Sequence, residues 1–383
     1  MKKIGHNYIT LRKIMIILGI VLVIELIIFA LYKLFYKDNN CYDIYDKQYN
    51  DLLVMDDGYI SIGYNNYKGT EDAKYYKGEL IYQGEIEKLD KDLNTVWTTS
   101  YYLDGNVTLT DIVKIKDGYI IVGTQTVELT HDNDNTGIII KVDKDGKIVK
   151  SLNYDLLDST ALYQIERDGN TNVIIGYSHY LPDIIGNHLG GGIILKVDDD
   201  LNIVEQNNYG GNKSGVFDKL FILDDSYLVY GMDAGYPIIV KFDKNFNREA
   251  DDTDLISKKV IYNKTLSKDL EFYPFYYNDN KLYDRMNYLD IETGNIGVYD
   301  KDNVLNEKIL VLITDDKYYA TNTGEDFGTI IYQYDKNLKL IREDKNEVEV
   351  IKEIIPIKDN VIVIGNFCNG CNCTPKIKML IRQ

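Results

Sequence analysis

The sequence is poor in the residues from which most catalytic and metal sites are built. Its 383 residues include four Cys, four His, one Trp and five Pro. A Ser–His–Asp triad or a His-rich metal centre therefore has few parts to draw on. Basic residues are also outnumbered by acidic ones: the chain has 43 Lys and Arg and 60 Asp and Glu, which give a net charge of −17. This balance excludes the phosphate contacts that dominate nucleic-acid binding.

The N-terminus carries a long hydrophobic run. Residues 14–36 contain a stretch of about 20 residues that is apolar except for Glu25, which is enough to span the ~30 Å hydrocarbon core of a bilayer. Lys2, Lys3, Arg12 and Lys13 precede this stretch and place the N-terminus in the cytoplasm. We predict a cytoplasmic tail over 1–13, a transmembrane helix over 14–36, a linker over 37–40 and an extracytoplasmic domain over 41–383 of a cell-membrane protein.

Two alternatives to an uncleaved anchor fit the sequence less well. A cleaved signal peptide has a shorter apolar run and a small-residue cleavage site, which is not evident near Ala30. A lipid-modified Cys41 is disfavoured because Asp38, Asn39 and Asn40 precede it. Glu25 in mid-membrane is costly unless it is protonated or paired, so it is the candidate contact for a membrane partner, although a single acid can also simply be tolerated.

Two phrases recur along the rest of the chain. The first is a turn followed by an apolar strand, as in KDGYIIVG, and it occurs at 56–63, 116–123, 169–176, 224–231, 315–322 and 358–365. The second is a strand, an acidic turn and a strand, as in GIIIKVDKDGKIVK, and it begins at Gly84, Gly137, Gly192, Tyr236 and Gly328. Asp, Asn and Gly suit tight turns, and β-branched or aromatic residues suit strands. Each repeat is therefore expected to be two linked hairpins.

A recurring four-stranded unit of this size is typical of a β-propeller blade. We predict an all-β, seven-bladed propeller, with six blades as the alternative, because residues 268–302 look like a degraded copy. The apolar GYIIVG strand should be covered on both faces, and strands such as KIVKS should lie near the rim. The last copy has three strands, so residues 41–46 are expected to pair with it and close the ring, which would leave no long free edge.

The four cysteines lie at the two ends of the predicted propeller: Cys41, Cys368, Cys371 and Cys373. Outside the cytoplasm, a disulfide from Cys41 to one of the other three, with a second among the remainder, would fasten the closure. Loop-entropy models assign such a long loop roughly 4–5 kcal/mol. A zinc site is the alternative, because C-N-G-C-N-C has thiolate-ligand spacing.

These phrases resemble the bacterial surface and secreted β-propeller repeat proteins, in which a DGGY-apolar-G strand precedes an apolar-K-x-D-x-G-x-I hairpin. The resemblance covers residues 49–383 and implies the fold, not an activity. The abundance of Tyr, Ile, Asn and Lys is typical of an AT-rich bacterial genome. LDIETGNI at Leu289 is also similar to a turn of quinoprotein propellers, but Trp97 is the only Trp, so no cofactor is implied.

Several motifs have a structural explanation beside a functional one. Acidic residues in the predicted turns suggest a calcium site, but the complete calcium-binding loop is absent and tight turns prefer the same residue types. The acidic turn residues are Asp90, Asp143, Asp145, Asp198 and Asp200. HDNDNTG from His131 is a weak calcium candidate. His179 and His188 flank a long loop without visible partners, and the glycine-rich stretch from Gly186 precedes a strand. Tyr-rich segments from Ala73 and Glu271 fit either a contact surface or strand formation.

No catalytic residue, metal ligand or cofactor is therefore assigned, and the chain is predicted not to be an enzyme. The expected function is that of a membrane-anchored binding or scaffold module for a protein, peptide or glycan. The alternatives are an extracytoplasmic hydrolase or lyase with acids and His at the channel mouth, or a subunit of an envelope complex held through Glu25.

Overall fold

Pairs of β-hairpins recur along the chain, as the two sequence phrases predict. The computed structural model describes residues 47–380, except 67–74, 77–78, 129–132, 157–158, 180–189, 210–214, 234–235, 247–273, 275, 285–286, 292, 294, 299–308, 315, 322–329, 346–349, 358–359 and 370–371. For some strand residues only the backbone is described. The chain divides into two units, 1–44 and 45–383, and the first lies outside the described residues. The predicted membrane helix and Glu25 therefore lie there too.

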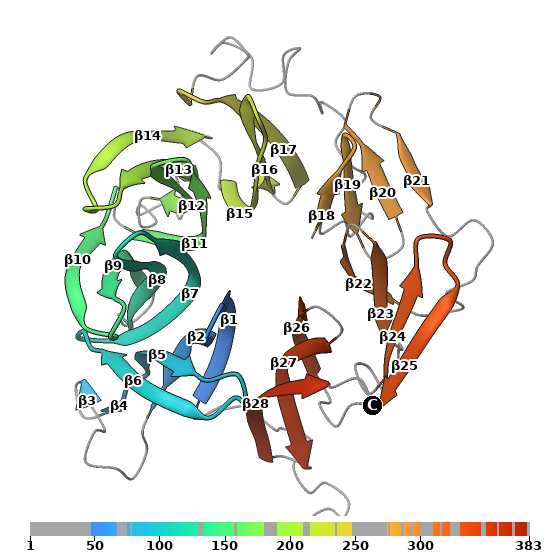
Figure 1. Cartoon of the computed structure of the whole chain (residues 1–383). Coiled ribbons are helices and arrows are strands. Elements are labelled where there is room, and N and C mark those ends of the chain that lie inside the picture. Colours follow the sequence, from blue (N-terminus) through green and yellow to red (C-terminus); the bar gives the residue numbers. More distant parts are fainter. Residues whose placement is uncertain are drawn as a thin grey trace, which may run out of the picture. The chain divides into compact units, whose positions relative to one another are not determined.

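The first three blades are four-stranded antiparallel sheets (Figure 1). Blade 1 consists of β1 (Lys47–Met55), β2 (Gly58–Asn65), β5 (Gln83–Leu89) and β6 (Thr95–Tyr101), with a small hairpin of β3 (Tyr75–Tyr76) and β4 (Glu79–Leu80) inserted. Blade 2 consists of β7 (Asn106–Ile115), β8 (Gly118–Glu128), β9 (Asn133–Asp143) and β10 (Ile148–Tyr154). Blade 3 consists of β11 (Ser159–Asp168), β12 (Thr171–His179), β13 (Gly190–Asp198) and β14 (Ile203–Tyr209).

Four more sheets complete a seven-bladed propeller. Blade 4 has β15 (Gly215–Ile222), β16 (Ser226–Asp233) and β17 (Tyr236–Asp243). Blade 5 has β18 (Tyr276–Asn278), β19 (Lys281–Asp284), β20 (Asn287–Asp290) and β21 (Ile296–Val298). Blade 6 has β22 (Ile309–Ile313), β23 (Lys317–Thr321), β24 (Ile330–Asp335) and β25 (Leu340–Lys345), and blade 7 has β26 (Val350–Ile357), β27 (Asn360–Asn369) and β28 (Asn372–Leu380). The degraded copy is thus a blade, and seven is correct.

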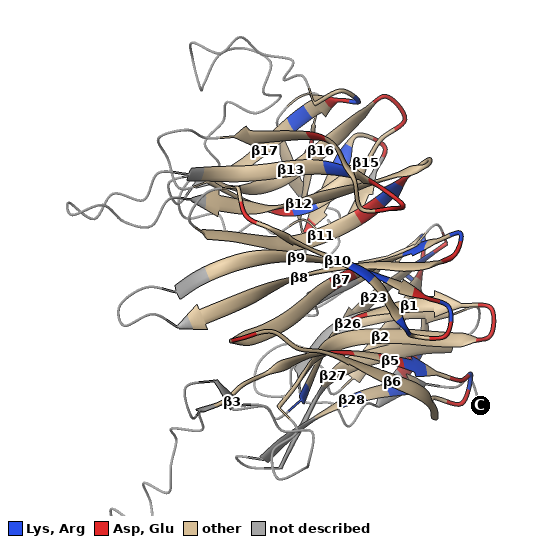
Figure 2. Cartoon of the chain, turned by 90° about the vertical axis from the view of Figure 1, so that its left-hand side faces the viewer, with Lys and Arg blue, Asp and Glu red and all other residues tan. Residues whose placement is uncertain are grey.

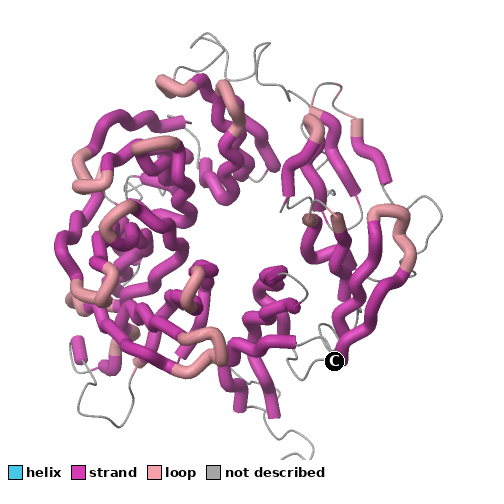
Figure 3. The backbone as a smooth tube through the Cα atoms, viewed as in Figure 1, coloured by secondary structure: helices cyan, strands magenta, loops and turns pink. Residues whose placement is uncertain are grey.

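The described part of the chain is built from strands and loops, and Figure 3 shows no helix in it. In each blade the first strand lies nearest the centre of Figure 1. The second strand of blade 2 is buried on both faces, as predicted: Ile120 packs toward blade 3, whereas Ile121 packs toward blade 1. The rim strands β6 and β10 are the outermost strands of their sheets, also as predicted.

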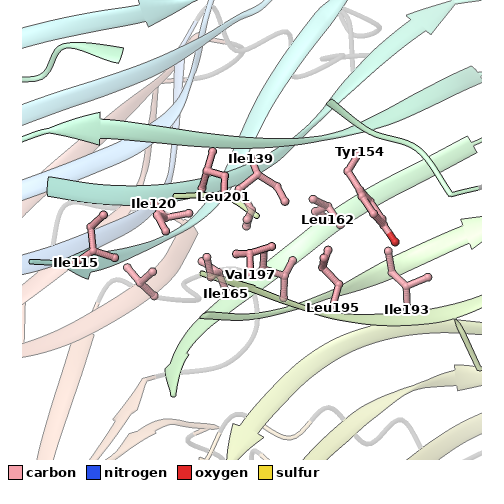
Figure 4. Close-up of a cluster of buried hydrophobic side chains, with 13 residues drawn as sticks. Ile115, Ile120, Ile139, Tyr154, Leu162, Ile165, Ile193, Leu195, Val197 and Leu201 are labelled. Carbon is pink, nitrogen blue, oxygen red and sulfur yellow. The ribbon is translucent and has the colours of Figure 1, made fainter. Parts of the chain in front are cut away.

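The cores lie between neighbouring blades. Figure 4 shows the largest, in which side chains from blades 2 and 3 interdigitate, among them Ile139 and Leu195, both with 0% exposure. Blades 7 and 1 share a cluster in which Leu52 and Tyr59 lie with Ile362 and Ile364. Because blades cover one another's faces, no sheet has to be stable alone. The strand predicted over residues 41–46 to complete blade 7 lies outside the described residues.

Candidate functional site

An irregularity recurs in the first strand of six blades. The pairing of the first strand with the second shifts by one residue, which is the mark of a β-bulge. The extra residues are Asn50, Thr110, Tyr163, Asp218, Val311 and Lys352. A bulge re-aims the side chains around it. Because these strands are the innermost of each blade, the bulges of blades 1 to 4 place polar residues along the inner wall of the propeller.

In blades 1 and 2 the bulge residue reaches the next blade. Asn50 Nδ2 donates to the Leu109 carbonyl oxygen at 2.6 Å, and Thr110 Oγ1 donates to the Leu162 carbonyl oxygen at 3.0 Å. The two accepting residues occupy equivalent positions, one before the bulge of the following blade. These bonds satisfy carbonyls that the register shift leaves out of the strand pairing.

The residue after the bulge forms a second link, which we call the inter-blade clasp. Asp111 Oδ2 accepts a hydrogen bond from the Ile165 amide of blade 3 at 2.8 Å, and its Oδ1 accepts one from the Ile112 amide at 2.7 Å. Gln164, at the equivalent position in blade 3, accepts from the Leu220 amide at 2.8 Å and donates to the Leu220 carbonyl at 3.3 Å. The clasp thus ties blades 2, 3 and 4 together at their inner edges.

Acidic side chains from blades 1, 2 and 3 meet at the clasp. Burial raises the pKa of Asp111 well above its ordinary value, and the charge of Asp51 and a hydrogen bond with Asp51 raise it further, against the opposing bond from Ile165. Burial also raises the pKa of Glu166; the bond from Gln164 opposes this change and the charge of Asp51 adds to it. Acidic side chains of three consecutive blades thus lie close enough at the clasp to influence one another electrostatically.

Blade 4 adds a fourth acid at the bulge. Burial raises the pKa of Asp218 to about 6, although the neighbouring Lys219 lowers it. Burial raises the pKa of the Tyr163 hydroxyl most, and the neighbouring Tyr177 and Asp218 raise it further. This phenol therefore stays protonated. The rings of Tyr163 and Tyr177 are 5.7 Å apart, and Asn135 Nδ2 donates to the Tyr177 hydroxyl at 2.9 Å. Acids and phenols therefore extend along the inner wall from blade 1 to blade 4.

Replacing Asp218 with Asn should change how stability depends on pH. The pKa of Asp218 is raised on folding, so its contribution to stability is present below about pH 4 and is lost as the pH rises through about 6. At pH 7.5 the variant should be more stable than wild type by about 1–2 kcal/mol, after allowance for solvent screening. Urea unfolding between pH 4 and 8 measures this. Equal pH profiles of the two proteins would contradict the raised pKa.

A second charged group lies on the face of blade 1 toward blade 7. Lys47 forms ion pairs with Glu85 and, at 3.1 Å, with Glu87. Tyr49 and Thr95 donate hydrogen bonds to Glu87 at 3.2 Å and 2.5 Å. Both acids are buried, and burying them without partners would be costly. Lys47 and neutral hydrogen-bond donors give each acid partners, and the group is best explained as support for the blade.

The acidic residues form the tight turns that the sequence predicts. Asp198 Oδ1 accepts hydrogen bonds from the Asp200 and Asn202 amides at 2.9 and 2.8 Å, and Asp143 and Asp90 do the same in their turns. A residue with positive φ closes each turn, such as Leu201 at 59°. Figure 2 shows the acidic residues gathered at such turns on one side of the propeller. Among the described residues, no group of three or more His, Cys, Asp or Glu could hold a metal ion.

The other predicted residues lie apart from the inner wall or outside the description. His6, His131, His188, Cys41 and Cys371 are outside the described residues. His179 ends β12, and Cys368 and Cys373 lie on β27 and β28, all three with backbone only. No disulfide is present among the described side chains, and the disulfides stay a prediction. No helix within the described ranges is long and apolar enough to cross a membrane.

Sequence reasoning missed the clasp acids. A signal for them exists: at the same place in four first strands, a polar residue directly precedes an apolar one, in NDLL, TDIV, YQIE and DKLF. The strands themselves were predicted, but a bulge and a contact with the next blade are tertiary features that no single strand reveals.

The comparisons with known proteins agree with this fold. No protein family and no curated protein matches the sequence. Acylaminoacyl peptidase from Pyrococcus horikoshii is similar at a TM-score of 0.50 and 10% identity over 87% of this chain and 51% of that one, so this chain spans about half its length. The β-propeller domain of the Trilobed protease from Pyrococcus furiosus has a TM-score of 0.44 and 10% identity, over 83% and 89% of the two chains.

A putative 6-phosphogluconolactonase from Bacteroides fragilis NCTC 9343 has a TM-score of 0.42 and 12% identity, over 86% of this chain and 100% of that one. At such identities the likeness concerns the propeller fold alone.

Proposed function

We propose that this chain is a single-pass membrane protein whose propeller lies outside the cytoplasm and binds a positively charged segment of a protein or peptide at its inner wall. The observation that carries the proposal is the row of acids on four consecutive innermost strands. It consists of Asp51, Asp111, Glu166 and Asp218. Of these, the pKa of Asp111, Glu166 and Asp218 is raised.

The raised pKa values predict that binding depends on pH. A bound cation would favour the ionised carboxylates and lower their pKa, so binding would release protons. Affinity should therefore rise with pH through about 6, where Asp218 titrates. It should also fall with salt, because the attraction is electrostatic. A polyanion or a neutral glycan would show neither trend.

The test uses the full chain in detergent, with hexalysine as the probe and hexaglutamate as the opposite-charge probe. Titration calorimetry in buffers of different ionisation enthalpy reports both affinity and released protons. We expect Glu166→Gln and Asp218→Asn each to weaken hexalysine binding about tenfold, equivalent to about 1.4 kcal/mol. Asp200→Asn is the matched control, since its side chain is 77% exposed at an outer turn. Equal binding by all variants, or tighter binding of hexaglutamate, would overturn the proposal.

The membrane topology is tested separately. Protease added to intact cells should degrade the propeller and leave residues 1–13 protected, because the predicted helix over 14–36 would hold them on the cytoplasmic side. Protection of the propeller until the cells are lysed would place it inside.

Catalysis by a hydrolase or lyase is the second candidate. Asp218 has a pKa of about 6 and can hold or release a proton near neutral pH, as a general acid must. This candidate predicts turnover of chromogenic ester or glycoside substrates that Asp218→Asn abolishes. Absence of turnover over such a panel would favour the binding module.

A further inference from the structure

The last hairpin of the propeller places two cysteines opposite each other. In β27 and β28, Cys368 is the Cα partner of Cys373, and Asn369 is the partner of Asn372, with two residues between them in the sequence. The cysteine pair is therefore the second pair from the connection.

The register also suits a disulfide. In a hairpin with a two-residue connection, the pair next to the connection exchanges hydrogen bonds and the following pair does not. Non-hydrogen-bonded partners have Cα atoms about 4.5 Å apart, within the ~4.4–6.8 Å range of disulfides. Cys368 and Cys373 occupy that second pair. Cys371 lies in the sequence between β27 and β28, outside the described residues.

We propose that Cys368 and Cys373 form a disulfide across the tip of the last hairpin. The bond forms by thiol–disulfide exchange. One cysteine thiolate attacks glutathione disulfide, releases one glutathione thiolate and forms a mixed disulfide. The second cysteine thiolate then attacks the cysteine sulfur of the mixed disulfide and releases the other glutathione thiolate. The two cysteines together lose two electrons and two protons, and the external disulfide is reduced to two thiols. Oxidation in the cell rests on the proposed extracytoplasmic location, whereas the choice of partners rests on the register alone.

The pairing is tested on the full chain in detergent with the double variant Cys41→Ser, Cys371→Ser, which retains only Cys368 and Cys373. After equilibration with reduced and oxidised glutathione, free thiols are alkylated and the mass is measured. The matched control, Cys41→Ser with Cys373→Ser, retains Cys368 and Cys371. We expect the first variant to be oxidised with an equilibrium constant at least about tenfold greater than that of the control. An equal or smaller constant would overturn the pairing.

The wild-type chain from cells provides the second readout. Hydroxylamine cleaves at Asn369–Gly370 and separates Cys368 from Cys371 and Cys373, while Cys41 stays on the Cys368 fragment. Peptide mapping should then recover Cys368 linked to Cys373 until a reductant is added. A link from Cys368 to Cys371, or thiols that become reactive only on zinc chelation, would overturn the proposal. If the pair oxidises in glutathione but is reduced in cells, the pairing stands and the extracytoplasmic location fails.

Discussion

Replacing Phe217 with Ala is expected to lower the free energy of unfolding by about 3–5 kcal/mol, the usual cost of removing a fully buried aromatic ring. Phe217 has 0% exposure and lies in the cluster shared by blades 3 and 4. Its ring centroid is 5.6 Å from that of Tyr209 in blade 3 and 6.0 Å from that of Phe242 in blade 4. Urea unfolding measures the loss.

Two further variants make this prediction specific. Val204→Ala removes a side chain that is 57% exposed on β14 and should change stability by less than about 0.5 kcal/mol. Gly192 lies against the Phe217 ring, where an added Cβ would be 2.5 Å from Cγ, so Gly192→Ala should cost about 1–3 kcal/mol. In the Phe217→Ala background the same change should cost less, because the cavity accepts the methyl group. Strictly additive losses would mean that the two blades do not share this core.

The second large effect concerns the inter-blade clasp. Asp111→Ala removes the acceptor of the Ile112 and Ile165 amides, and it is expected to cost about 2–4 kcal/mol because buried donors lose their partners. Asp111→Asn retains one of the two acceptor oxygens and removes the like charge beside Asp51. We therefore expect this variant to lose less stability than Asp111→Ala at pH 7.5, because only one of the two amides loses its acceptor.

The dependence of stability on pH separates the effect of the Asp111 hydrogen bonds from the effect of the Asp111 charge. The folded pKa of Asp111 is raised, so its contribution is present at low pH and decreases as the pH rises above the ordinary carboxyl range. Wild type should lose stability with rising pH relative to Asp111→Asn, and calorimetric unfolding over pH 4–8 would show the difference. If Ala and Asn variants lose the same stability at every pH, the hydrogen bonds to Ile112 and Ile165 do not matter.

The Asp218→Asn test in blade 4 complements this one, because burial, opposed by the charge of Lys219, raises the pKa of Asp218. That variant changes a charge at the inner wall, whereas Asp111→Ala removes hydrogen bonds that include one between blades. Comparing the two variants separates the effect of inner-wall charge on stability from the effect of the inter-blade hydrogen bond.

The sequence by itself determined the repeat, the strand order and the blade count, because turn residues and strand residues act within a few positions of each other. The degraded fifth blade followed from the same local chemistry, as did the Asp198 turn. Only the tertiary structure decided which polar groups meet. Asp111 and Ile165 are 54 residues apart and Gln164 and Leu220 are 56 apart, so their contact depends on how one blade packs on the next and on a bulge within each inner strand. The acidic wall arises from that packing, because burial and neighbouring carboxylates, not residue type, set the raised pKa values.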